Sequence, residues 1–203
     1  MSVITWPDFG VSSFRWKKAN KAIAFRSVFG AQAIEAATPL WEVDITGAIE
    51  ARLTGISIQT FLESLNGFGN QLSLWNIGQT APAGTMRGTM TLSADAAQGA
   101  TSLVIDAGVG QAAKTLLAGD LVGLGSGLTQ QVLRVSADAT ANGSGVITVT
   151  IGTALRNAFS AGAAVTWDKP AALFRVKEIP PALEFVGPNT TPWSLSLIED
   201  WRP

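Results

Sequence analysis

The sequence predicts a mainly β protein: a β-sandwich with one α-helix and an inserted small antiparallel β-barrel-like domain. Many short β-branched runs are separated by turn-forming residues, and the 203 residues include 21 glycines. The stretch "PLWEVDIT" alternates apolar and polar residues, as a strand with one buried face does. Hydrophobic residues make up 47% of the chain and charged residues 14%, so it can bury one large core or two small ones.

The first domain is predicted to open with three strands, at residues 13–17, 22–27 and 39–46. In the first of these, Phe14 and Trp16 share one face. In the third, the apolar face consists of Trp41, Val43 and Ile45.

One amphipathic helix is predicted at residues 57–66. Its apolar residues recur at helical spacing, at Ile58, Phe61, Leu62 and Leu65. We expect Ser57 to be the N-cap, and Asn66 with Gly67 to form the C-cap. The next segment alternates Leu72 and Leu74 with polar residues, which predicts a strand that returns to the sheet.

A second domain is predicted at residues 86–169, because short strands at close spacing follow the turn-rich stretch 78–88. Within it, residues 137–145 are expected to form a hairpin loop. The last strands are expected to complete the first sheet. The first domain is therefore discontinuous, at residues 1–85 plus 170–203, and the second domain is an insertion.

Composition narrows the function. Fourteen basic residues oppose fifteen acidic ones without clustering, so we expect protein partners and no specific nucleic acid. Cysteine and histidine are both absent, which excludes Ser-His-Asp and Cys-His catalysis and the usual zinc sites. No apolar run approaches the roughly twenty residues of a membrane span. We expect a protein that is made in the cytoplasm and stays soluble.

The stretch "SLVIDAGVGQAAKT" resembles a nucleotide-binding P-loop, with Gly108 followed six residues later by Lys114 and Thr115. Ala113 stands where the second glycine is needed, and the segment after Lys114 is too short for the helix that would hold phosphate. The sequence favours a strand followed by a wide turn. We expect no nucleotide binding and no cofactor.

Two other patterns are candidate sites. Asp138, Thr140 and Asn142 alternate as in the first half of a calcium loop, but Val149 occupies the position of the bidentate glutamate. Asn142 with Gly143 is typical of a hairpin turn, so we expect no metal. Glu42 with Asp44, and Glu199 with Asp200, are close carboxylate pairs. For the pair Glu42 and Asp44 the sequence favours a solvated strand face over acid-base catalysis.

The remaining candidates are hydroxyl and aromatic side chains. Ser12 and Ser13 lie near Lys17 and Lys18 in the sequence, but without the glycine-rich oxyanion setting that serine-lysine catalysis requires. No catalytic residues are predicted, so we expect no enzyme. Seven tryptophans without any tyrosine suggest sugar stacking, for which Trp167 is the best candidate. Core and interface packing are the alternative for these rings.

Five segments carry a resemblance to a known family through their order along the chain: "PLWEVDIT" at 39–46, "IQTFLESLNGF" at 58–68, the block at 116–151 that begins "LLAGDLVGLG", "AALFRV" at 171–176 and "WSLSLIED" at 193–200. They resemble the distal tail protein of long-tailed bacteriophages, one of the tail-tip and hub proteins. In that comparison Leu117, Ala118, Gly119 and Asp120 make a tight turn that leads into a strand.

The resemblance implies a structural virion protein of the phage tail tip, assembled in the host cytoplasm. It implies a hexameric ring that joins the tail tube to the baseplate hub and the host-recognition apparatus, and it supplies no catalytic residues. Two other classes stay open: a carbohydrate-binding or adhesin-like β module that uses exposed tryptophans, and a hydrolase that uses carboxylates such as Glu42 and Asp44.

Overall fold

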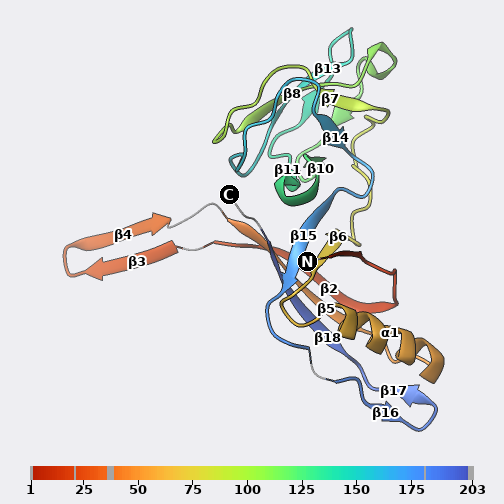
Figure 1. Cartoon of the computed structure of the whole chain (residues 1–203). Coiled ribbons are helices and arrows are strands. Elements are labelled where there is room, and N and C mark those ends of the chain that lie inside the picture. Colours follow the sequence, from red (N-terminus) through yellow and green to blue (C-terminus); the bar gives the residue numbers. More distant parts are fainter. Residues whose placement is uncertain (1, 21, 36–38, 181, 201–203) are drawn as a thin grey trace. The chain divides into compact units, whose positions relative to one another are not determined.

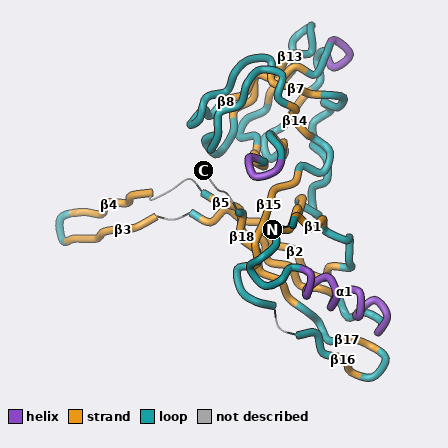
Figure 2. Tube along the Cα trace, in the orientation of Figure 1, coloured by secondary structure: helices purple, strands orange, loops and turns teal. Residues whose placement is uncertain are grey.

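The computed structural model describes residues 2–20, 22–35, 39–180 and 182–200 (Figures 1 and 2). Within these residues the chain is mainly β with one α-helix, which confirms the predicted fold class. The chain divides into two compact units, one formed by residues 2–74 with 173–200 and the other by residues 75–172. The sequence had suggested division points at 85/86 and 169/170.

The first unit is built on a six-stranded sheet with the order β1-β6-β15-β18-β5-β2. The strands are β1 (Val3–Thr5), β6 (Gln71–Trp75), β15 (Ala171–Val176), β18 (Ser194–Glu199), β5 (Leu40–Gly47) and β2 (Val11–Ala19). On β5 the predicted alternation is confirmed, since Trp41, Val43 and Ile45 are buried and the residues between them are half-buried. Strand β5 comes from the first part of the chain and β18 from the last part, and the two pair antiparallel inside the sheet.

The helix α1 spans Arg52–Ser64 and starts five residues before the predicted position. Ser57 is therefore not the N-cap. It is a residue of the helix itself, and its hydroxyl donates to the carbonyl of Leu53 at 3.5 Å. The first turn is held by backbone instead, because the N–H of Arg52 donates to the carbonyl of Pro188 at 2.9 Å. At the other end Asn66 and Gly67 have φ of 49° and 58°, as the predicted C-cap requires.

Gly55 explains how the helix fits against the chain's C-terminal part. A Cβ at Gly55 would lie 2.2 Å from Thr190 and 2.9 Å from the ring of Phe185. These contacts come from the small antiparallel pair β16 (Phe185–Val186) and β17 (Asn189–Thr190). Trp6 covers another part of the helix, with its ring 5.6 Å from that of Phe61.

The strands β3 (Ala22–Ser27) and β4 (Gly30–Glu35) form a separate antiparallel hairpin. Among the described residues the two strands pair only with each other. The hairpin continues the ribbon of β2 and β5, because Ala19 pairs with Leu40 and, further along, Ala22 pairs with Glu35. Val28 and Phe29 form the two-residue turn that connects β3 and β4.

The second unit contains a six-stranded antiparallel sheet with the order β11-β10-β14-β7-β8-β13. Its strands are β11 (Gln131–Arg134), β10 (Leu121–Leu124), β14 (Ala164–Thr166), β7 (Met90–Leu92), β8 (Ser102–Asp106) and β13 (Val146–Thr150). The sheet curls until its two edges meet at a bridge between Val135 and Ile151. Apolar side chains such as Leu103, Ile105 and Val149 fill the interior, so the unit is a small barrel with its own core.

Residues 137–145 are not the simple hairpin loop that the sequence suggested. They contain β12 (Ala139–Thr140), which leaves the barrel sheet to pair with β9 (Thr115–Leu116). The positive φ in this turn falls on Gly145, at 83°, and not on the predicted pair Asn142 and Gly143. The side chain of Asn142 organises the turn, since its Oδ1 accepts the N–H of Ser144 and of Val146.

The chain leaves the first sheet at the end of β6 and returns at the start of β15, and these two strands are neighbours in that sheet. Within the second unit the two connecting segments lie together. The ammonium of Lys169 lies 5.1 Å from the ring centroid of Trp75, and the backbone N–H of Lys169 donates to the carbonyl of Thr80 at 2.7 Å.

Candidate functional site

The P-loop-like segment folds as a strand and a wide turn, as the sequence favoured. After β8 the Oδ1 of Asp106 accepts the N–H of Gly108 at 2.8 Å, and a short 3-10 turn follows at Val109–Gln111. Ala113 has φ of 59°, and Lys114 leads directly into strand β9. The helix N-terminus that a phosphate cradle needs is therefore not formed after Lys114.

The phrase "LLAGD" forms the tight turn that the family resemblance implied. The N–H of Asp120 donates to the carbonyl of Leu117 at 3.0 Å, and Gly119 at the turn has φ of 100°. The Asp120 carboxylate is buried and accepts three backbone N–H groups: Ala83 at 2.7 Å, Gly84 at 3.1 Å and Leu117 at 2.7 Å. Asp120 thus fastens the segment at 83–84 to the start of β10, a role that the sequence did not reveal.

The calcium-like residues are engaged in backbone hydrogen bonds. Asp138 Oδ1 accepts the N–H of Ala118 at 2.8 Å, Thr140 lies in β12, and Asn142 holds its own turn. Within the ranges that the structure describes, no three carboxylate side chains gather closely enough to hold a metal ion.

Glu42 and Asp44 lie on one face of β5 and belong to an ion-pair network. Lys17 on β2 lies 3.4 Å from Glu42 and 3.2 Å from Asp44, and Lys177 lies 3.3 Å from Glu42. Ser196 on β18 donates to Asp44 at 3.1 Å. These five side chains connect β2, β5, β18 and the end of β15 on the polar face of the sheet.

The network shifts the pKa values of Asp44 and Lys17. Burial raises the pKa of Asp44, but hydrogen bonds from Lys17 and Ser196, with the charges of Lys17 and Arg15, outweigh it. The pKa of Asp44 therefore lies below its ordinary value of 3.8. The hydrogen bond to Asp44 is the main reason why the pKa of Lys17 lies above 10.5. Both shifts favour the charged pair, which suits a structural role better than proton transfer.

Glu199 and Asp200 point to different partners and do not act as a pair. Glu199 is buried and accepts the backbone N–H of Trp41 at 3.0 Å. Asp200 forms an ion pair with Arg175 at 2.9 Å and accepts the amide of Gln71 at 2.5 Å. The alternation along β18 could have predicted that Glu199 is buried, because Glu199 falls on the same face as the buried Leu195 and Leu197.

The serine and lysine residues near the N-terminus are separated in the fold. Ser12 donates to the carbonyls of Thr46 and Gly47, at 3.0 and 3.3 Å. Lys17 belongs to the carboxylate network, and Lys18 lies over the ring of Trp41 at 5.6 Å from its centroid. The structure therefore does not bring these hydroxyl and ammonium groups into one site.

The Trp167 indole is held by its surroundings. Its N–H donates to the carbonyl of Gly88 at 2.7 Å, and the guanidinium of Arg87 lies over the ring at 5.0 Å from the centroid. The ring also packs against the core of the barrel. A sugar that stacks on Trp167 would have to compete with Arg87 for a ring face.

The sequence did not single out the largest exposed apolar side chains. At the end of the β3–β4 hairpin, Phe25, Val28 and Phe29 are 58%, 96% and 98% exposed. On α1, Leu53 and Ile56 are also exposed. The signal was present in "FRSVFG", because two-residue hairpin turns favour Asn and Gly, and here the turn consists of a valine and a phenylalanine.

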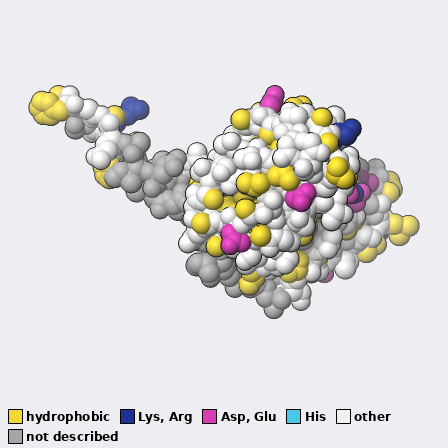
Figure 3. Space-filling view, turned by 90° about the horizontal axis from the view of Figure 1, so that it is seen from above, with side chains coloured by type: hydrophobic (Ala, Val, Ile, Leu, Met, Phe, Trp, Pro, Cys, Tyr) yellow, Lys and Arg dark blue, Asp and Glu magenta, His cyan; other side chains and the backbone are white. Residues whose placement is uncertain are grey.

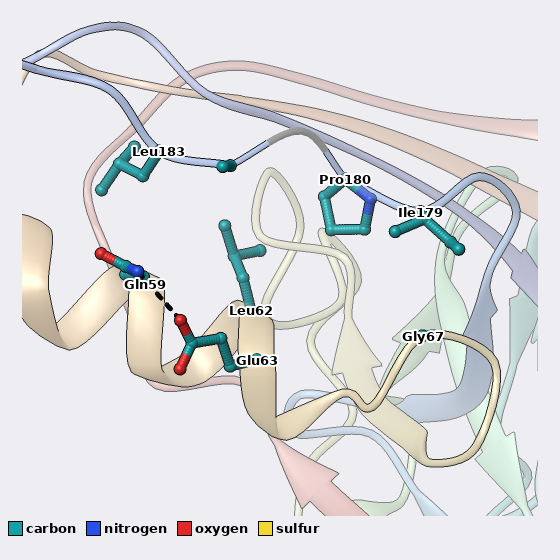
Figure 4. Close-up of a pocket in the computed structure, with 8 residues that line it drawn as sticks. Gln59, Leu62, Glu63, Gly67, Ile179, Pro180 and Leu183 are labelled. Carbon is teal, nitrogen blue, oxygen red and sulfur yellow. Dashed lines mark hydrogen bonds between the residues drawn. The ribbon is translucent and has the colours of Figure 1, made fainter.

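A shallow groove of about 260 Å³ runs between the last turns of α1 and the segment before β16 (Figure 4). Leu62, Ile179, Pro180 and Leu183 line it together with Gln59 and Glu63. The Gln59 amide donates to Glu63 at 2.9 Å, drawn as the dashed line. The groove is therefore apolar with one acidic side chain at its edge.

The 13 residues of α1 are too few to cross a membrane, and no other helix in the described part of the chain is long and apolar enough. Comparison of the sequence with protein-family models and with curated proteins gives no match.

Proposed function

We propose that this chain is a structural protein of a bacteriophage tail tip, which assembles into a ring between the tail tube and the baseplate hub. The order of segments that resembles distal tail proteins supports this proposal. The mainly β architecture with one helix is compatible with it. In this role the protein is not an enzyme and acts through contacts with copies of itself and with neighbouring tail proteins.

The observation behind the proposal is the apolar surface of the first unit. Val28 and Phe29 expose almost whole side chains, Phe25 exposes more than half, and Leu53 is 81% exposed on α1. Burying a side chain of this size is worth about 1.5–3 kcal/mol, so such residues in water mark a surface that a partner covers. Protein contact explains these residues better than a small-molecule site does.

The outer strand β2 of the main sheet is poorly suited to pairing with another chain. The edge strand β2 carries Arg15, Lys17 and Lys18, and such basic side chains discourage edge-to-edge association. We therefore expect the ring contacts to involve the apolar surface and not an extension of the sheet through β2. A head-to-tail contact that repeats around an axis closes into a ring when its rotation allows.

The copy number of six follows from the resemblance, because the ring would continue a sixfold tail tube. The test combines light scattering on the purified protein with averaged electron micrographs of rings and assembled tails. Six copies at the position of this protein support the proposal. Any other copy number at that position, or absence of the protein from the tail tip, contradicts it.

A further inference from the structure

We propose that the tip of the β3–β4 hairpin of one chain docks into the α1 groove of the next chain. The hairpin tip consists of Phe25, Arg26, Val28 and Phe29, and the α1 groove consists of Gln59, Leu62, Glu63, Ile179, Pro180 and Leu183. This inference rests on the proposed ring and names the contact that would build it.

The hairpin tip has the features of an inserted element. Figure 3 shows hydrophobic side chains, in yellow, gathered at the end of the hairpin. Val28 and Phe29 form the turn itself and are 96% and 98% exposed. Glycine or asparagine would satisfy a two-residue turn better. A valine and a phenylalanine at this place are explained by a surface that receives them.

The α1 groove has a size and lining that fit such side chains. Its volume of about 260 Å³ equals roughly nine water volumes, at about 30 Å³ each. That is room for one or two large side chains and not for a folded domain. Ile179 is 68% exposed beside the groove, so an inserted aromatic ring would also cover apolar surface that now faces water.

The charges of the two surfaces are complementary. Arg26 is the basic side chain of the hairpin tip, whereas Glu63 lines the groove. Glu178 and Glu184 flank the groove segment in the chain and are exposed. Arg26 would lie beside these carboxylates when the tip is docked. Their attraction favours the hairpin tip over an occupant that is acidic or uncharged.

The strand register directs the contact to another copy. The hairpin extends from the end of the β2–β5 ribbon where Ala19 pairs with Leu40. The groove segment that contains Ile179 runs toward the opposite end, because the N–H of Lys177 donates to the carbonyl of Ser196, which lies opposite Asp44, and the chain continues from there toward the level of Gly47. At about 3.3 Å per residue these two ends of β5 lie about 23 Å apart. A tip at one end and a receiving groove at the other make a head-to-tail contact, which is the kind that closes into rings.

The absence of cysteine from the sequence allows a direct test. Val28→Cys and Gln59→Cys are prepared as separate full-length variants and mixed under mild oxidation at about 1 mM, so that contacts with a Kd as weak as about 1 mM are populated. Each chain carries one cysteine, so any 28–59 disulfide joins two chains. Mass spectrometry of the linked peptides should find this disulfide. The control is a mixture of Val109→Cys with Gln59→Cys, because Val109 is an exposed residue of the second unit. The 109–59 disulfide should form at least tenfold less than the 28–59 disulfide.

A charge exchange provides the second variant set. Arg26→Glu should lower the yield of the 28–59 link at least fivefold, and Glu63→Arg in the partner chain should restore it. The thermal transition of every variant is measured to show that the chains are folded.

The same samples are imaged for rings, which separates the contact from the proposed function. Links together with rings support both. Links without closed rings support the contact and contradict the ring. Rings without links overturn the contact alone, and the absence of both at 1 mM overturns both.

Discussion

Replacing Asp120 with alanine should destabilise the barrel unit far more than loss of an ordinary surface carboxylate would. Asp120 is 1% exposed, and its two oxygens accept three backbone N–H groups at 2.7–3.1 Å. Alanine removes all three acceptor contacts at once. The N–H groups of Ala83, Gly84 and Leu117 then lack this partner, although the barrel strands themselves are unchanged.

The magnitude follows from the burial of these donors. A buried donor without a partner costs about 1–3 kcal/mol, and hydrogen bonds to a charged group are worth about 1.5–3 kcal/mol each. The Gly84 N–H is buried and bears the full cost, whereas Ala83 and Leu117 lie closer to water and recover part of it. We expect a total loss of about 3–5 kcal/mol. At about 5 °C per kcal/mol for a unit of this size, the melting temperature should fall by about 15–25 °C.

Asp138→Ala is the matched control. Asp138 lies in the same unit and accepts one N–H, from Ala118 at 2.8 Å, but its carboxylate is exposed. Water replaces that bond, so the melting temperature should change by less than about 5 °C. Differential scanning calorimetry of both variants and the parent is the measurement. If Asp120→Ala melts within a few degrees of Asp138→Ala, the three hydrogen bonds do not hold the unit together and the reasoning is wrong.

Three further predictions test the first unit and its junction. Gly47→Ala should cost about 3 kcal/mol or more in denaturant unfolding, because its Cβ would lie 1.9 Å from the Trp193 ring, whereas Gly143→Ala meets nothing within 4 Å and should be neutral. Asp44→Asn should cost less than about 1 kcal/mol at pH 7, and this cost should vanish as the pH falls below 3.8, because the pKa of Asp44 is depressed in the fold. Replacing residues 77–169 with a glycine-serine linker should leave a remainder that melts cooperatively, since the connecting segments lie together; a gradual melt would mean that the two units depend on one another.

The strands of this protein could be predicted because their patterns are local. On β5 and β18 the alternation of apolar and polar residues alone gave the buried face. The helix was also predicted, but its start was wrong because Gly55 is a poor helix residue by propensity. Glycine fits at position 55 because the helix lies very close to Thr190 there. Thr190 is far along the chain, so a local sequence pattern does not contain this contact.

The residues of the candidate site were harder to predict for a similar reason. Asp120 was identified as part of a turn, yet two of its three partners are the N–H groups of residues 83 and 84, within the turn-rich stretch 78–88. The apolar hairpin tip was counted only as a strand, because "AIAFRS" fits a strand pattern without its turn. The exposure of these side chains depends on what the hairpin packs against. No sequence pattern predicts that β3 and β4 pair only with each other within the described residues.

The distribution of charge on the first unit favours assembly through its ends. On the polar face of the sheet, Lys17 and Lys177 already neutralise Glu42 and Asp44. A partner that covered this face would have to desolvate satisfied ion pairs, which costs several kcal/mol per ion and returns little. The hairpin tip and the α1 groove instead present apolar surface with single charges of opposite sign. Association there would remove apolar area from water without breaking an existing ion pair. A contact between the hairpin tip and the α1 groove of neighbouring chains would therefore cost less desolvation free energy than a contact on the polar face of the sheet.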